Sequence, residues 1–324
     1  MTGDIDIVIP WVNPNDDIWF EDYKKACEIY KGDKDPSRIR DFGLFPYFFR
    51  CISENAPWVR KVHLILYSES QIPKWLNTNC DKLAVHFHRE ILDPEYIPTF
   101  SCFHYFHNIW KLKDLAEDFI WFNDDQFIVN PVAKSDFFAD EIPVDTASES
   151  LQINSNPKHE EYLTRDKIFW NDGKQKLDFF QTIVLNSLRL SEKYTGKFRI
   201  YKNPHVTISC KKTEVKRFFT DIENELKKVN LPTDKFRVNT NVDEAWVYRY
   251  IRLSLGLFKE QIRSDFVYIE PHNDNYKEIM DLTLRTKVLC INDCPWHGDN
   301  FDLIRDRLVK IFKAKFPLKS EFEK

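Results

Sequence analysis

Three consecutive residues, Asn123, Asp124 and Asp125, carry the side-chain oxygens best suited to chemistry in this sequence. They follow Phe119 to Phe122, an apolar run long enough for a buried strand and too short for a helix. Open α/β sheets bind ligands at the carboxyl ends of their strands. Adjacent carboxylates need a compensating cation, and such ligands suit Mg²⁺ or Mn²⁺. The stretch therefore predicts a site for a metal-bound diphosphate, although Asp-Asp taken alone is more typical of a solvated turn after a strand.

Other polar residues lie at the end of a second predicted strand or shortly after it. Ile5 to Asn13 predicts this strand, and its turn brings Asn13 and Asp16 to the acidic end of the sheet if both strands run parallel. Ordinary turn chemistry explains the same two residues. Arg40 and Arg50 suit either the neutralisation of phosphate charge or surface salt bridges, and their spacing does not decide between these roles.

The elements that must position these residues alternate along the chain. Val62 to Tyr67 and Leu83 to His88 predict strands, and Ile18 to Tyr30 predicts a helix. This alternation favours an α/β fold with a mostly parallel central sheet flanked by helices. We expect one domain over residues 1–324, in which residues 1–135 form the α/β half and residues 136–324 a mainly helical half that completes the site.

The remaining segments are predicted from their periodicity and polarity. Helices are expected over Phe103 to Leu115, Phe179 to Glu192, Thr213 to Val229 and the stretch ending at Leu255. Loops are expected over Ala133 to Asp145 and Asn154 to Trp170, the latter as a mobile cover. Val288 to Asp293 predicts a strand that ends in Asn292 and Asp293. Ile304 to Lys319 predicts a basic amphipathic helix, suited to anionic lipid or to packing on the domain.

Composition narrows the class of protein. The chain has 324 residues, 43% of them apolar, which is enough for a full core. A net charge of −4 gives no case for nucleic-acid binding. There is no apolar run of the ~20 residues that a membrane-spanning helix needs, and no signal peptide is recognisable. We therefore expect a cytoplasmic protein, whose only expected membrane contact is peripheral, at the inner membrane surface.

Histidines and cysteines offer a second kind of metal site. The seven cysteines are an odd number and scattered, which fits reduced thiols better than disulfides. Cys290, Cys294 and His297 are close in sequence, but buried thiols are favoured over a zinc site because a second ligand pair is missing. His104 and His107 share one face of a predicted helix and are better explained by packing than by metal binding.

Motifs in order along nearly the whole chain resemble the Stealth family of hexose-1-phosphate transferases, which includes bacterial capsule and cell-wall polysaccharide phosphotransferases and the lysosomal-enzyme N-acetylglucosamine-1-phosphotransferase. Each motif is weak alone, but their order makes chance similarity improbable. The matching segments are Asp6 to Asn13 with Asp16, Arg40 to Arg50, Asn55 to Lys61, Gln71 to Leu76, Pro98 to Ser101, Phe122 to Asp125, Asn186, Pro204-His205, Arg237 to Asp243, Cys290 to Asp293 and Phe316 to Glu323.

The resemblance implies a nucleotide-sugar transferase fold, Rossmann-like or GT-A-like, and a specific reaction. A hydroxyl of an acceptor glycan attacks the β-phosphorus of a UDP-sugar, so that sugar-1-phosphate is transferred, a phosphodiester forms and UMP is released. The implied role is capsular or other cell-surface polysaccharide synthesis, with Mg²⁺ or Mn²⁺ as cofactor. Residues 1–135 then become the nucleotide-sugar-binding half and residues 136–324 the acceptor side.

Family roles carry over to the matching positions. The resemblance implies that Asp124 and Asp125 hold the metal and that Arg237 binds the phosphate. It also implies His205 as the base, with Asp243 in support. Substrate-binding roles are implied for Asn13, Asp16, Arg40, Arg50, Asn292 and Asp293.

The chain departs from the family pattern after Pro98 to Ser101. Where relatives carry a glutamate and a His-Arg pair, this sequence has Phe106, Trp110 and Lys111. Two alternatives therefore remain: a metal-dependent glycosyltransferase that releases UDP, and a non-catalytic carbohydrate-binding protein. Identification of the released nucleotide distinguishes the glycosyltransferase from a sugar-phosphate transferase. Detection of turnover distinguishes an enzyme from the non-catalytic binding protein.

Overall fold

The computed structural model, which describes residues 3–147, 179–199, 201, 205–293 and 300–324, is built around a five-stranded sheet. The strand order is β3-β2-β1-β4-β8. The first four strands run parallel and β8 pairs antiparallel with β4. The predicted mostly parallel central sheet is therefore confirmed. Its strands are β1 (Ile5–Pro10), β2 (Val62–Leu66), β3 (Leu83–Phe87), β4 (Asp118–Trp121) and β8 (Ile208–Lys211).

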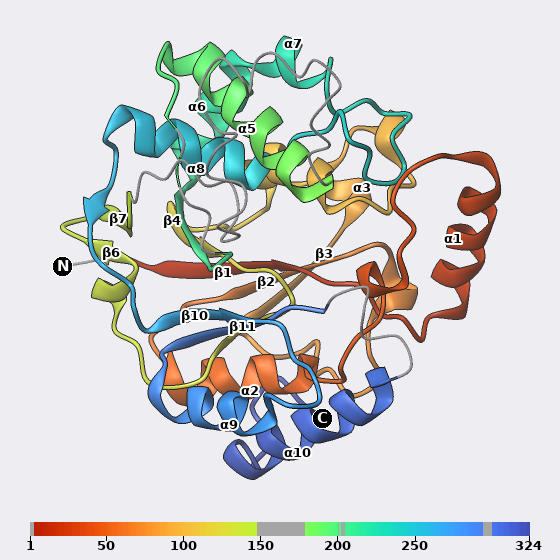
Figure 1. The fold of residues 1–324 in the computed structure, drawn as a ribbon, viewed down its shortest axis with the longest axis vertical. Coiled ribbons are helices and arrows are strands. Elements are labelled where there is room, and N and C mark those ends of the chain that lie inside the picture. Colours follow the sequence, from red (N-terminus) through yellow and green to blue (C-terminus); the bar gives the residue numbers. More distant parts are fainter. Residues whose placement is uncertain (1–2, 148–178, 200, 202–204, 294–299) are drawn as a thin grey trace.

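Helices cover both faces of this sheet because its strands are apolar on both faces. In β1, Ile7 and Ile9 face one core and Val8 faces the other. Figure 1 shows helices on both sides of the sheet. The first core contains α2 (Phe45–Asn55), α9 (Tyr276–Arg285) and α10 (Phe301–Lys315), and the second contains α5 (Phe179–Thr195), α6 (Lys212–Asp221), α7 (Glu223–Leu226) and α8 (Glu244–Leu255).

Two smaller sheets extend the core. The second sheet has the order β10-β11-β5, and β5 pairs antiparallel with β11. Because β5 follows β4 after a short turn, this turn connects the central sheet to the second sheet. The strands are β10 (Phe266–Ile269), β11 (Val288–Ile291) and β5 (Gln126–Ile128), and those of the third sheet are β6 (Phe138–Ala139), β7 (Ile142–Asp145) and β9 (Lys259–Glu260).

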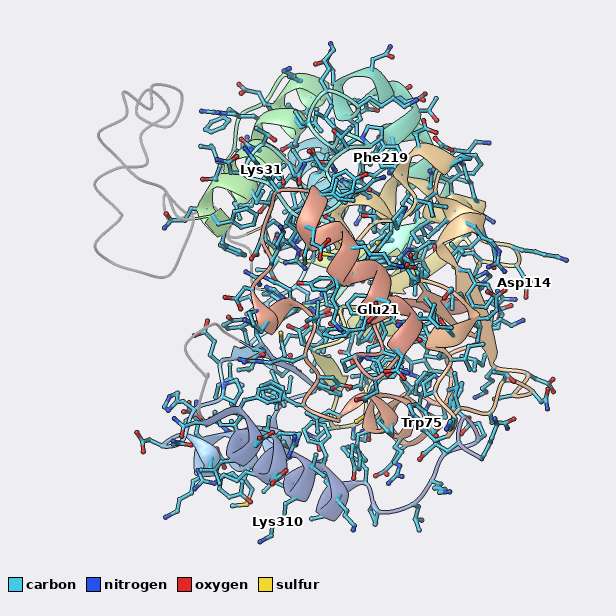
Figure 2. All side chains as sticks on the ribbon, turned by 90° about the vertical axis from the view of Figure 1, so that its right-hand side faces the viewer. Glu21, Lys31, Trp75, Asp114, Phe219 and Lys310 are labelled. Atoms are coloured by element: carbon cyan, nitrogen blue, oxygen red, sulfur yellow. The ribbon has the colours of Figure 1, made fainter. Side chains whose placement is uncertain are left out.

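Most predicted elements form close to their expected bounds. The helix α1 (Asp17–Ile29) lies on the outside of the molecule, where Figure 2 looks onto it and its exposed Glu21. The short helix α3 (His88–Ile91) follows β3 directly. The amphipathic stretch predicted over Thr213 to Val229 divides into α6 and α7, with Ile222 between them outside helical geometry. The expected cover over Asn154 to Trp170 lies outside the described residues.

Two predictions about local structure were wrong. Phe103 to Leu115 forms the 3₁₀ segments η4 (Cys102–His104) and η5 (Phe106–Lys111) instead of an α-helix. Phe103, Phe106, Ile109, Leu112 and Leu115 are buried at every third position, which is the period of a 3₁₀ helix, and His104, Tyr105 and Asn108 are buried between them. The loop expected over Ala133 to Asp145 contains the hairpin β6–β7. Asp140 and Glu141 turn it with positive φ, as tight hairpin turns require.

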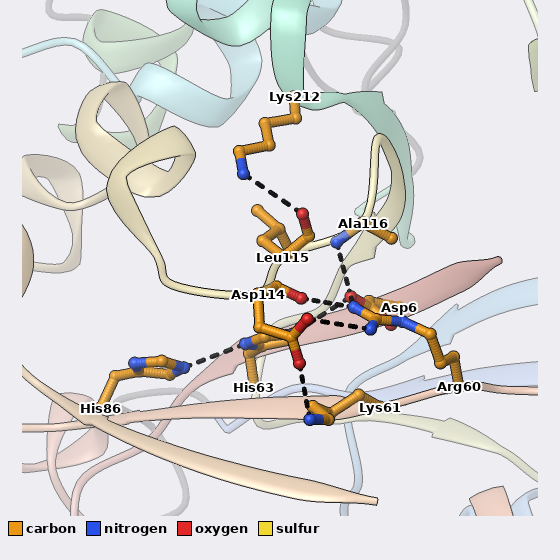
Figure 3. A network of polar contacts seen from close by, with 9 residues as sticks. All are labelled: Asp6, Arg60, Lys61, His63, His86, Asp114, Leu115, Ala116 and Lys212. Carbon is orange, nitrogen blue, oxygen red and sulfur yellow. Dashed lines mark hydrogen bonds and ion pairs between the residues drawn. The ribbon is translucent and has the colours of Figure 1, made fainter.

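A buried carboxylate joins β1 to its neighbours at the amino end of the sheet (Figure 3). Asp6 is fully buried and forms a two-point ion pair with Arg60, whose Nε and Nη2 lie 2.9 and 2.6 Å from the two carboxyl oxygens. His63 Nε2 and the backbone N–H of Ala116 contact the same carboxylate at 3.1 and 2.7 Å. His86 continues the chain of contacts from His63. Asp6 is therefore part of the scaffold.

Among the described residues, no helix is long and apolar enough to cross a membrane.

Candidate active site

The acidic residues lie in the turn between β4 and β5. β1 and β4 run parallel, so the predicted position of Asn123, Asp124 and Asp125 at the carboxyl end of a strand of a parallel sheet is confirmed. Gln126 accepts a hydrogen bond at Oε1 from the backbone N–H of Asn123 at 3.1 Å. The carbonyl of Asp125 accepts one from Ile291 of β11 at 2.8 Å. Both ends of the turn are therefore fixed, one locally and one by the second sheet.

His205 lies directly against this turn. Its Nε2 is 3.5 Å from Asp125 Oδ2 and 3.5 Å from Asn123 Nδ2. Its backbone has φ of +49°, a conformation that is uncommon for a residue with a side chain and that occurs more often at functional sites. The Nε2 of Gln126 donates to the His205 carbonyl at 3.3 Å and helps to hold it there.

Asp125 makes His205 a stronger base. Burial disfavours the charged imidazole, but the hydrogen bond and the negative charge of Asp125, together with the charge of Asp243, outweigh this effect. The net result is a raised pKa of His205. An imidazole in this position accepts a proton more readily than one in water, and the neighbouring carboxylate stabilises the imidazolium that forms.

Arg237 and Asp243 belong to the same electrostatic cluster. Arg237 donates from Nη2 to the sulfur of Cys102 at 3.1 Å and lies 5.0 Å above the ring of Phe103. Its positive charge favours lower pKa values of Asp124, His205 and Asp243. Asp243 caps α8, since its Oδ1 accepts hydrogen bonds from the backbone N–H groups of residues 245 and 246. The structure thus brings together Asp124, Asp125, His205, Arg237 and Asp243.

Negative charge accumulates at this site. Although Asp124 is exposed, the surrounding protein removes part of its hydration, and Asp125 and Asp41 repel its charge. These effects raise the pKa of Asp124 to about 7. Loss of hydration also raises the pKa of Asp243, to about 6. Such raised pKa values show that too little positive charge lies near these carboxylates. This is expected where a bound cation, or the guanidinium of an arginine that binds the substrate, compensates their negative charge.

The donor atoms fit a divalent cation. Asp125 Oδ1 is buried and, within the described part of the chain, has no hydrogen-bond partner. A buried carboxylate oxygen without a partner is costly unless something outside the chain binds it. Asp124 and Asp125 would hold the ion, and carboxylate oxygens are the ligands that Mg²⁺ and Mn²⁺ prefer.

Arg40, Asn292 and Asp293 lie together next to β11. Arg40 forms a two-point ion pair with Asp293, in which Nη2 is 2.8 Å from Oδ1, and its guanidinium stacks on the ring of Phe301. Asn292 donates to the hydroxyl of Tyr268 at 3.1 Å. The ring of Tyr268 in turn lies 5.4 Å from that of His205. Asn292 is thereby connected to the site through one aromatic side chain.

Asn13, Asp16 and Arg50 make structural contacts. Asn13 and Gln71 exchange hydrogen bonds through backbone and side-chain atoms. Asp16 caps α1 with one carboxyl oxygen and accepts from Ser70 and Gln71 with the other. Arg50 forms a two-point ion pair with Glu323 near the end of the chain. Their substrate-binding roles remain predictions, and these contacts give each residue a role in the fold.

Three residues near the site were not among the predicted site residues. Cys290 of β11 lies beside Asp125, Cys102 accepts from Arg237, and Asp41 acts on Asp124. Cys290 and Asp41 each fall within a matching family segment, and Cys290 was also considered in the sequence as a zinc ligand together with Cys294 and His297. Cys290 is buried, as predicted, whereas Cys294 and His297 lie outside the described residues.

The two histidines of the 3₁₀ segment are explained by packing. His104 is buried, and its Nδ1 contacts the hydroxyl of Thr99 at 3.2 Å. Burial lowers the pKa of His104 to about 4. His107 contacts the buried carboxylate of Glu244 through its backbone N–H and Nδ1.

Comparisons with known proteins identify the family of this chain. Residues 38–145 match the family model described as Stealth protein CR2, conserved region 2. The chain is 32% identical to the exopolysaccharide phosphotransferase cps2G of Lactiplantibacillus plantarum, over 99% of this chain and 96% of that protein. It is 31% identical to a capsular polysaccharide phosphotransferase WcwK of Streptococcus pneumoniae, over 99% and 98% of the two chains. The chain belongs to the Stealth family. It is therefore an enzyme, a transferase, and the resemblance predicted from its motifs is confirmed.

One solved structure covers 95% of both chains: the galactosyltransferase LgtC in complex with donor and acceptor sugar analogs, with a TM-score of 0.43 and 12% identity. This similarity is too weak to support a conclusion.

Within the Stealth family, the position expected to hold a glutamate is Phe106 here. Its ring packs against Trp121, Phe219 and Tyr248 inside the core.

Proposed function

We propose that this Stealth protein transfers a hexose-1-phosphate unit from a UDP-sugar to a hydroxyl of an acceptor glycan, in the synthesis of a capsular or other cell-surface polysaccharide. One observation carries the proposal. Carboxylates, an arginine and a histidine converge at the carboxyl end of β4, in a chain that matches named polysaccharide phosphotransferases over nearly its full length.

In this proposal His205 takes the proton of the acceptor hydroxyl. The hydroxyl oxygen attacks the β-phosphorus, and the bond from this phosphorus to the bridging oxygen breaks. The products are a phosphodiester and UMP. Asp125 supports the step because its charge favours the protonated imidazole next to it.

Arg237 neutralises charge on the phosphates, since its charge already acts on Asp124 and Asp243 at the edge of the site. When bound, Mg²⁺ or Mn²⁺ would withdraw electron density from the phosphate oxygens. Asp124 and Asp125 are the residues proposed to hold it. Phosphoryl transfer depends mainly on such positioning and charge compensation.

A panel of UDP-sugars with Mg²⁺ and a glycan acceptor tests the proposal, with the released nucleotide identified by chromatography. UMP is expected, together with a phosphodiester in the product. Release of UDP would instead show transfer of the sugar alone by a metal-dependent glycosyltransferase. Binding without turnover of any donor would refute the enzymatic proposal for this chain.

We also propose that the protein acts in the cytoplasm and contacts the inner membrane surface peripherally. α10 and the residues after it carry the exposed lysines 310, 313 and 319, and Leu318 beside them is 80% exposed. Figure 2 shows Lys310 directed outward from this helix. Basic residues next to an exposed apolar side chain suit an anionic lipid surface. Sedimentation with vesicles containing phosphatidylglycerol, but not with phosphatidylcholine vesicles, is the expected result; no sedimentation with either would refute the contact.

A further inference from the structure

Three chemically different metal ligands converge on one point of the site. Asp125 comes from the β4–β5 turn, Cys290 from β11, and His205 from the segment before β8. One ligand atom from each, a carboxylate oxygen, a thiol sulfur and an imidazole nitrogen, lies within 4.8 Å of the other two. All three come from distant parts of the chain, so the tertiary fold alone brings them together.

The backbone fixes the relative positions of these ligands. Cys290 is paired with Gln126 in the antiparallel register of β11 and β5, and the next residue along β11 donates to the carbonyl of Asp125. Gln126 also donates to the carbonyl of His205. One residue, Gln126, thus connects the strand of the cysteine to the histidine. Such rigid positioning favours metal binding, because little order has to be imposed when the ion enters.

An independent observation points to a ligand at the same place. The Oδ1 atom of Asp125 is buried and, in the described part of the chain, accepts no hydrogen bond. Solvent still reaches the site, since the side chains of Asp125 and His205 are 18% and 22% exposed. An ion can therefore reach an oxygen that otherwise has no partner.

The donor set selects the kind of ion. Mg²⁺ binds oxygen atoms and gains little from sulfur, whereas Zn²⁺ binds sulfur, nitrogen and oxygen together. Three protein ligands with a remaining open position are a common zinc arrangement.

We propose that Asp125, His205 and Cys290 bind Zn²⁺ or a cation of similar softness, and that this ion inhibits the enzyme. Cys290 gives up its proton to solvent when its sulfur binds the ion. The bound ion occupies the imidazole nitrogen of His205, so the base is lost. It also competes with the catalytic cation for Asp125, so that cation loses one ligand. The inhibition rests on the proposed function, whereas the binding does not.

Cobalt provides a readout that does not depend on activity, because Co²⁺ bound to a thiolate absorbs in the near ultraviolet. Titration of the metal-free protein with Co²⁺ is expected to produce this absorption with one equivalent, and Zn²⁺ is expected to abolish it. Cys290→Ser should lack it and bind Zn²⁺ at least about tenfold more weakly in competition with a chelating dye. Cys80→Ser, which removes a partly exposed thiol elsewhere, is the matched control and should behave as the wild type.

Absence of the absorption in the folded wild type, or its persistence in Cys290→Ser, would overturn the zinc site. If Cys290→Ser does not fold, His205→Gln serves instead: its Zn²⁺ affinity should fall by a similar factor, and an unchanged affinity would refute the site.

Activity is measured separately with Mg²⁺ in zinc-free buffer. Cys290→Ser should remain active and resist micromolar Zn²⁺ that inhibits the wild type and Cys80→Ser. Equal sensitivity of all three proteins would refute the inhibition even if cobalt binds. A wild type without transferase activity but with the cobalt absorption would refute the proposed function alone.

Discussion

Replacement of Asp6 by alanine should destabilise the protein strongly without a direct effect on chemistry. The carboxylate is fully buried and is contacted by two nitrogens of Arg60, by His63 Nε2 and by the N–H of Ala116. Its removal leaves the buried His63 and this N–H without their partner. Breaking a buried ion pair of this kind costs about 3 to 5 kcal/mol. Because the side chain of Arg60 is 28% exposed and can turn to solvent, we expect the lower end, about 3 kcal/mol.

Urea unfolding followed by circular dichroism measures this loss, and Asp114→Ala is the matched control. Asp114 pairs with the same arginine but its side chain is 53% exposed, so its loss should destabilise the protein much less than the loss of Asp6. Transferase activity per folded molecule should persist in both variants, because the network lies at the amino end of the sheet. A loss for Asp6→Ala no greater than that for Asp114→Ala would refute the assignment of Asp6 as a scaffold residue.

The pH dependence of stability has a defined sign here. Burial raises the pKa of Asp6, but the contacts with His63, Arg60 and Ala116 outweigh it, so the pKa of Asp6 is lowered overall. A carboxylate with a lowered pKa stabilises the fold above its ordinary value, about pH 4, and this stabilisation is lost as the pH falls further. The stability difference between the wild type and Asp6→Ala should therefore shrink below about pH 4 and stay constant from pH 5 to 7.

Three further predictions concern the site. Asp125→Ala should abolish transfer with the fold retained, because the phosphate charge loses its compensation; full activity of this variant, or of the wild type in excess chelator, would contradict the metal role. His205→Ala should lower turnover by roughly 10² to 10⁴, and a change in substrate affinity alone would make it a binding residue. Arg237→Met should lower kcat/KM by about 10- to 100-fold, as expected for loss of a charged contact, and its failure to do so would place the phosphates elsewhere.

The sequence predicted the sheet well because its strands are short apolar runs bounded by polar turns. Phe119 to Phe122 is an example: its length and its apolar residues indicated a strand, and the position of Asp124 and Asp125 followed from it. Such a prediction needs only local information. The parallel pairing of β1 with β4 was assumed from the alternation of elements, and the structure confirms it.

Contacts between distant segments could not be predicted in the same way. The proximity of Cys290 to Asp125 depends on antiparallel pairing between β5 and β11, and no local pattern encodes which strands pair. Likewise, the types of Asp16 and Arg50 suit phosphate chemistry and structural contacts equally. Only the tertiary structure shows that Asp16 caps α1 and that Arg50 meets Glu323.

The 3₁₀ segment illustrates a different limit. Five of its buried apolar residues, from Phe103 to Leu115, recur at every third position. It was interpreted as an α-helix because apolar residues three apart also occur on one face of an α-helix. The two periods differ too little over a dozen residues for the pattern alone to separate them.

The capping of α1 by Asp16 has a consequence for genetic experiments. A bacterium carrying a substitution at this position would lose surface polysaccharide if the enzyme were degraded, just as it would if the chemistry failed. Loss of the polymer in vivo therefore cannot distinguish a folding residue from a reacting one. Protein abundance has to be measured in the same cells before a signature residue of this family is assigned to the reaction.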